Sequence, residues 1–202
     1  MSTPYRYAVY LIPPYPVSRK VSEIHHLLEK QFGLKAGGRF QVHATIKGFF
    51  KKTPGPLDPI IKRLDAVFVD QRPLLVSAEG LRRDEIGFGI DLSQLNGQLN
   101  QPLLDFRERV VDAVRPFIAP DCDFVDSDLG PPFRAHLTLA FRDIPPDAYD
   151  QIVAWTMDAQ PFFGPFIASD FHFLEFHSNQ WEGAWWEDLT WRLIKAWRLQ
   201  GS

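Results

Sequence analysis

The sequence predicts one mixed α and β domain of 202 residues, built from two related and interlocked lobes. The order strand, helix, strand, helix, strand occurs twice, over 5–81 and 86–199, and the middle strand of each half carries the same H-x-T motif. No low-complexity linker separates the halves, and their parts are too short to be stable alone. Residues 1–202 are therefore expected to form a single two-lobed unit whose halves are related by a pseudo-twofold axis.

The first half is expected to begin with a strand at 5–12, "YRYAVYLI", which is aromatic and β-branched and is followed by two prolines. Apolar residues then recur at helical spacing over 18–32, and Gly33 is placed to end that helix. Asp58 and Pro59 are typical of a helix start. The remaining elements expected here are a strand at 42–50, a helix at 57–70 and a strand at 73–81.

The second half repeats this order and adds late strands. Expected elements are a strand at 86–93, a helix at 97–117, a strand at 134–142, a helix at 146–157, and strands at 165–177 and 185–199 around the turn "SNQWEG". In the last strand Trp185, Trp191 and Trp197 share one parity with Leu189 and Leu193, which predicts a common core face. Trp181, in the turn, is expected to cover an edge.

One long loop interrupts the second half. Residues 118–133, "IAPDCDFVDSDLGPPF", contain four aspartates and adjoining prolines just before the second H-x-T strand. We expect a flexible rim beside the neighbouring site.

Composition narrows the class of protein. Apolar residues make up 45% and charged residues 23%, which is typical of a globular chain. The lone Cys122 excludes an internal disulfide and a thiolate zinc site and favours the cytoplasm. No stretch approaches the ~18 apolar residues of a membrane span, and the N-terminus lacks a signal-peptide pattern.

The net charge of -3 argues against a long nucleic-acid surface but permits a small anionic substrate. A monomer is the default expectation.

The H-x-T motif appears in "VHATIKGFF" and again in "AHLTLAF". Six histidines and six threonines predict roughly 0.2 chance matches in a chain of this length, yet two occur, each in an apolar strand at the same place in its half. Strand alternation predicts that His43, Thr45 and Lys47 share one face. It likewise predicts one face for Arg134, His136, Thr138 and Arg142.

Two convergent histidines suit phosphodiester chemistry. One imidazole takes a proton from the attacking oxygen and the other gives a proton to the leaving oxygen, since a pKa of ~6.5 permits both forms near neutral pH. Threonine hydroxyls can donate to the non-bridging phosphate oxygens. Which histidine is acid and which is base stays open, because related halves make the two look alike.

Each of these residues also has a simpler explanation. The alternative for His43 and His136 is a pair of ordinary core histidines, and the alternative for Lys47, Arg134 and Arg142 is a set of solvated sheet residues. His25, His26, His172 and His177 are expected to be structural.

The residues "HATIKGFF" and "HLTLAF" resemble the paired signatures of the two-histidine (2H) phosphoesterase superfamily, also called LigT-like or 2′-5′ RNA ligase-like. The resemblance covers nearly the whole chain. It implies a bilobal α+β fold with antiparallel sheets around a central cleft, no metal and no cofactor. It also implies hydrolysis of 2′,3′-cyclic phosphates, or ligation through 2′,5′ linkages.

Carried over by motif, His43 and His136 are the expected acid–base pair, and Thr45 and Thr138 the phosphate-binding hydroxyls. Many members continue the second motif as H-x-T-L-A-R, but Phe141 stands at the arginine position here and Arg142 follows it. Alternation predicts that Phe141 faces away from His136.

The sequence therefore favours a metal-independent 2′,3′-cyclic phosphodiesterase acting on RNA ends or small cyclic nucleotides, with a 2′-phosphomonoester product. The alternatives are a non-catalytic nucleotide or RNA-end binding module, a 2′-5′ RNA ligase, and, with least support, a histidine-ligated metal hydrolase.

Overall fold

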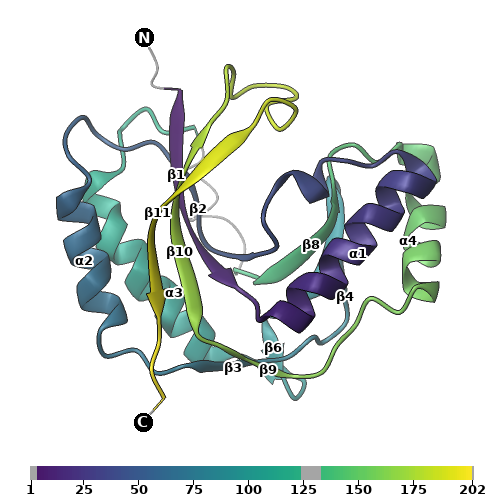
Figure 1. The fold of residues 1–202 in the computed structure, drawn as a ribbon, viewed down its shortest axis with the longest axis horizontal. Helices are drawn as coiled ribbons and strands as arrows, with labels where there is room; N and C mark the ends of the chain where they lie inside the picture. The colour runs from purple at the N-terminus through teal and green to yellow at the C-terminus, as the bar shows by residue number, and fades with distance from the viewer. Residues whose placement is uncertain (1–3, 124–132, 202) are drawn as a thin grey trace.

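The computed structural model describes residues 4–123 and 133–201. A seven-stranded antiparallel sheet runs through the molecule in the order β11-β10-β1-β2-β8-β5-β4, and two small two-stranded sheets, β3-β9 and β6-β7, accompany it. Helices α2 and α3 lie outside the half that contains β1, β2 and β10, while α1 and α4 lie outside the half that contains β8 (Figure 1). The α+β class with antiparallel sheets is confirmed.

The strands are bounded as follows: β1 Tyr5–Ile12, β2 Ala44–Phe50, β3 Leu74–Val76, β4 Leu81–Asp84, β5 Gly87–Asp91, β6 Gln94–Leu95, β7 Gln98–Leu99, β8 His136–Phe141, β9 Phe166–Ala168, β10 Asp170–His177 and β11 Thr190–Arg198. The α-helices are α1 Tyr15–Phe32, α2 Asp58–Phe68, α3 Gln101–Val114 and α4 Tyr149–Asp158. Short 3-10 turns occupy Gly37–Arg39 (η1), Arg115–Phe117 (η2) and Pro146–Ala148 (η4). Within the described ranges, no helix is both long enough and apolar enough to cross a membrane.

Most predicted elements are present, and several boundaries differ for local reasons. Helix α1 starts at Tyr15 because Pro16 is tolerated in a first turn, and it ends as predicted at Gly33, whose φ is 76°. The predicted helix at 97–117 begins only at Gln101. Asn96 and Gly97, with φ of 55° and 74°, turn the chain into the β6-β7 hairpin first.

Two predicted strands are each divided in the structure. Of the predicted strand at 73–81, only Leu74–Val76 forms β3. A separate strand, β4, begins at Leu81, and the sequence analysis missed it. The segment 165–177 is interrupted at Ser169, so that β9 pairs with β3 while β10 joins the large sheet beside β1. These divisions allow one stretch of chain to serve two sheets.

Two hydrophobic cores cover the two faces of the large sheet. The larger packs helix side chains against residues such as Val9, Ile46 and Phe173, all at most 1% exposed. The smaller contains Tyr10, Phe176 and Trp185 on the other face. The site described below lies on the face of the smaller core.

The prediction for the last strand is wrong in part. Trp185 is buried but precedes β11, and Trp197 stacks on Phe68 at a ring distance of 4.3 Å. Trp191 and Leu193, which were expected on the same core face, are 42% and 48% exposed. A β-bulge at Ile194 shifts the register against β10, so that Leu193 pairs with Leu174 of the smaller core while Trp197 pairs with Phe171 of the larger. The bulge therefore reverses the faces on either side of it.

The start of the predicted flexible loop is anchored. Arg6, 2% exposed, donates to both carboxylate oxygens of Asp123 at 2.9 and 2.7 Å, and Lys51 pairs with Asp121. The greater part of that loop, 124–132, lies outside the described residues.

Candidate active site

The two H-x-T motifs meet where the halves of the sheet join. Strands β2 and β8 are antiparallel, and Ala44 pairs with Leu137. Continuing this register by one residue in each direction places His43 opposite Thr138 and Thr45 opposite His136. Direct cross-strand neighbours lie about 5 Å apart at Cβ, so this register sets each histidine beside the threonine of the other motif.

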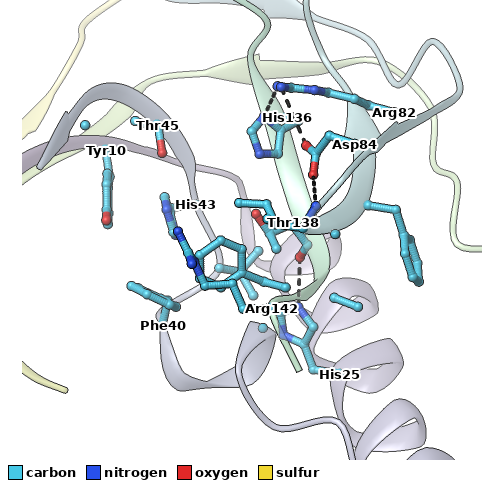
Figure 2. Close-up of a pocket in the computed structure, with 18 of the residues that line it drawn as sticks. Tyr10, His25, Phe40, His43, Thr45, Arg82, Asp84, His136, Thr138 and Arg142 are labelled. Carbon is cyan, nitrogen blue, oxygen red and sulfur yellow. Dashed lines mark hydrogen bonds and ion pairs between the residues drawn. The ribbon is translucent and has the colours of Figure 1, made fainter. Parts of the chain in front are cut away.

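All four side chains line one pocket of about 360 Å³ (Figure 2). Ala44 and Leu137, which alternate with them, are fully buried in the larger core. The sequence thus folds with its apolar residues toward the helices and its polar residues toward the pocket, as period-two alternation predicts for these short segments.

His43 lies among aromatic rings. Tyr10 stacks on it with centroids 3.6 Å apart and planes 15° apart, and Phe40 lies 5.8 Å away. The pKa of His43 is lowered from 6.5 to about 4, mainly by burial; the nearby His136 also lowers it, and the hydrogen bond to the Gln41 carbonyl opposes the shift. Its Nδ1 donates to the carbonyl oxygen of Gln41 at 2.8 Å, which leaves Nε2 as the free nitrogen.

His136 has a polar surrounding that the sequence analysis missed. Arg82 Nη1 lies 2.8 Å from His136 Nδ1 (Figure 2). It also donates to the Arg134 carbonyl oxygen at 2.9 Å, and His136 Nδ1 lies 3.0 Å from that same oxygen. Asp84 lies 3.6 Å from Arg82. Burial lowers the pKa of His136 and the Arg82 charge lowers it further, whereas Asp84 and Asp91 raise it. Arg82 and Asp84 alternate along β4 and so share its pocket face.

His25, expected to be structural, forms part of the pocket wall. Its Nε2 donates to the backbone carbonyl of Thr138 at 2.8 Å (Figure 2). Burial lowers its pKa, so the ring is neutral and acts as a support for β8. The sequence analysis gave no sign of this contact.

Two predicted cations do not join the pocket wall formed by the described residues. A β-bulge at Ile46 shifts the register between β1 and β2, so that Thr45 pairs with Tyr10 and Lys47 pairs with Val9. The bulge turns Lys47 to the face opposite that of Thr45. Its side chain is fully buried over the ring of Phe50, so the expectation that it shares the face of His43 is wrong. Arg134 is exposed, and only its carbonyl participates in the site.

The strand end after Thr138 also differs from the prediction. A β-bulge at Leu139 places Phe141 opposite Gly87 and turns it into the pocket, against the prediction that it faces away. Arg142 lines the pocket as well, in the left-handed conformation with φ of 62°. Its guanidinium lies 5.3 Å from the ring of Phe141 and 5.6 Å from that of Trp186.

Among the described residues, no group of three or more histidine, cysteine or acidic side chains is arranged to hold a metal ion. The pocket instead offers the imidazoles of both H-x-T histidines, the hydroxyls of both threonines and the cations Arg82 and Arg142, among aromatic walls. Such a set can bind a phosphate and move protons around it.

Comparisons with known proteins support this geometry at the level of the fold. No family model and no curated protein matches the chain. Among solved structures, E. coli LigT in apo form aligns over 99% of this chain and 100% of its own, with 17% identity and a TM-score of 0.56. TT0787 of Thermus thermophilus aligns over 97% and 98%, with 16% identity and a TM-score of 0.63.

The chain has the LigT-like fold. A crystal structure described as a phosphoesterase aligns over 98% of this chain and 100% of its own, with 16% identity and a TM-score of 0.56. These three likenesses extend over 97% to 99% of this chain.

Proposed function

We propose that this protein is a phosphoesterase that opens 2′,3′-cyclic phosphates by acid–base catalysis between His43 and His136, without a metal ion. The observation that carries the proposal is the pairing of Ala44 with Leu137, which brings both H-x-T motifs into one pocket. Structural likeness to LigT and to a phosphoesterase supports the reaction class.

In the proposed reaction, one imidazole Nε2 takes a proton from water as the water oxygen bonds to phosphorus. The bond from phosphorus to O3′ breaks, and O3′ takes a proton from the other imidazole, which leaves a 2′-phosphomonoester. Thr45 and Thr138 donate to the non-bridging oxygens and offset the charge that develops on them. The negative charge of the bound phosphate raises the pKa of both imidazoles, which burial holds low in the free protein.

The pocket walls suit a nucleotide. Phe40, Phe49 and Phe141 line the pocket and offer faces on which a base can stack. Crystal structures of E. coli LigT have been described with phosphate, with ATP and with 3′-AMP, so that protein accepts small nucleotides. We propose a small cyclic nucleotide or an RNA terminus as the substrate, with Arg142 contacting its phosphate.

The test is hydrolysis of a panel of 2′,3′-cyclic nucleotides, with products separated by chromatography. His43→Ala and His136→Ala should each lower kcat by about 10²–10⁴-fold, and the double variant should lose little more, because the pair acts as a unit. His26→Ala, which removes an exposed histidine of α1, is the matched control. Near-wild-type turnover by either single variant refutes the mechanism.

Other results from the same panel identify the alternatives. Phosphate-dependent nucleotide binding without any product indicates a binding module. Joining of RNA ends through a 2′,5′ linkage indicates the ligase reaction, which uses the same groups in reverse.

A further inference from the structure

A second pocket borders the candidate active site. It has a volume of about 480 Å³ and lies between α1 and the segment 35–40, "KAGGRF". His25 and Phe40 line both pockets, so the two cavities share a wall. In Figure 2 these two side chains lie at the lower edge of the active-site pocket, away from Arg82. A ligand bound at the two H-x-T motifs therefore has another cavity directly beside it.

The backbone of the segment "KAGGRF" forms the boundary between the pockets. Gly37 lines the first pocket and Gly38 lines the second. A Cβ atom on Gly37 would lie 2.9 Å from the carbonyl oxygen of Leu139, so the η1 turn packs directly against β8. Asp143 accepts from the backbone N–H groups of Lys35 and of the residue after it, at 2.6 and 2.8 Å. The boundary is therefore narrow, carries no side chain at its two glycines and is held in place from both sides.

The second pocket has an excess of positive charge. Its charged side chains are Lys35 and Arg39, which flank the glycines, and Glu29 of α1. Within residues 4–123 and 133–201, neither the Lys35 ammonium nor the Arg39 guanidinium has a hydrogen-bonding or ionic partner. A guanidinium fork and an ammonium together match the oxygens of a phosphate group. The pocket is therefore suited to an anionic group that reaches it from the active site.

A nucleotide has one further position that commonly carries a phosphate. When its 2′,3′-cyclic phosphate lies at the histidines, the O5′ atom lies at the other end of the ribose and is directed away from them. A phosphate on O5′ keeps a negative charge whether it is a free monoester or the diester that joins the preceding nucleotide of an RNA chain. Both sources present the same chemistry to Lys35 and Arg39.

We propose that the second pocket binds a phosphate attached to O5′ of the nucleotide whose 2′,3′-cyclic phosphate reacts at His43 and His136. Arg39 and Lys35 are its contacts. This inference rests on the proposed function, and it names the feature by which the protein selects among cyclic phosphates. Because the second phosphate is remote from the reacting bonds, it should act on binding more than on kcat.

Binding of two unreactive nucleotides tests the second site without any turnover. The probes are adenosine 2′-monophosphate and adenosine 2′,5′-bisphosphate, measured by isothermal titration calorimetry. The wild type should bind the bisphosphate about 10-fold more tightly, because hydrogen bonds between charged groups add to its affinity. Arg39→Gln should lose most of this advantage, and Lys35→Gln combined with Arg39→Gln should lose all of it.

Arg63→Gln is the matched control, because Arg63 is an exposed arginine of α2, which lies outside the other half of the sheet (Figure 1). It should keep the preference of the wild type for the bisphosphate. Equal affinity of the wild type for the two nucleotides, no binding of either, or a preference that survives in the double variant overturns the inference.

Kinetics distinguish the two sources of the second phosphate. The substrates are adenosine 2′,3′-cyclic phosphate, its 5′-phosphorylated form, an adenosine dinucleotide ending in the cyclic phosphate, and the same dinucleotide with an uncharged methylphosphonate linkage. A higher kcat/KM for the 5′-phosphorylated form alone assigns the site to a free phosphate. A higher value for the dinucleotide that is lost with the methylphosphonate assigns it to the diester of an RNA end.

The two proposals fail in different ways. Equal kcat/KM for all four substrates overturns the second phosphate site and leaves the proposed function in place. Failure to open any of the four cyclic phosphates refutes the proposed function, and the binding measurements still decide whether the second pocket holds a phosphate.

Discussion

The titration of His43 gives a prediction that depends on the structure alone. The ring is half-buried and stacked against Tyr10, and burial lowers its pKa from 6.5 to about 4. In the folded protein near pH 7 the ring is therefore neutral. The Cε1 proton signal of His43 should therefore stay in the neutral position until the pH falls well below 6.

The same shift makes stability depend on pH. Between pH 6.5 and about 4 the unfolded chain binds a proton at His43 and the folded chain does not, so the free energy of unfolding falls as the pH falls. The full shift corresponds to on the order of 3 kcal/mol. The stability contribution is complete above pH 6.5 and is lost toward pH 4.

The assay is urea unfolding at a series of pH values for the wild type and His43→Gln. The difference between the two curves should show a loss on the order of 3 kcal/mol for the wild type across this window. His26→Gln, at an exposed site, should follow the wild type. A His43 midpoint near 6.5 would show that the imidazole is solvated and would refute the account of the site given above.

Two further predictions concern backbone strain and the last strand. Arg142→Gly should raise the free energy of unfolding by about 1 kcal/mol, because glycine adopts a φ of 62° without strain, and should raise KM for the cyclic phosphate. Chemical denaturation measures the free energy of unfolding, and steady-state kinetics measure KM. A lower stability of Arg142→Gly than of the wild type would contradict the strain argument. Trp197→Ala should destabilise by about 2–4 kcal/mol and Trp191→Ala by under about 1, because only Trp197 packs on the larger core. Equal losses would refute the bulge at Ile194.

Much of the site was predictable from the sequence because its decisive residues are local. An imidazole and a hydroxyl two residues apart in an apolar strand must share a face, and their repetition in both halves predicted that they meet. Arg82 could not be found in this way, because β4 has no apolar alternation and its contact with His136 spans 54 residues. Tyr10 and His25 likewise reach the pocket through tertiary packing.

By itself, the sequence determined the class of fold, most helices and strands, and the two motifs that line the pocket, since these follow from the spacing of apolar residues. Tertiary structure decided which residues beyond the motifs face the site. Bulges at Ile46, Leu139 and Ile194 each add one residue to a strand, and a single added residue reverses every face that follows. Such bulges arise from the fit between neighbouring strands, which no pattern within a single strand records.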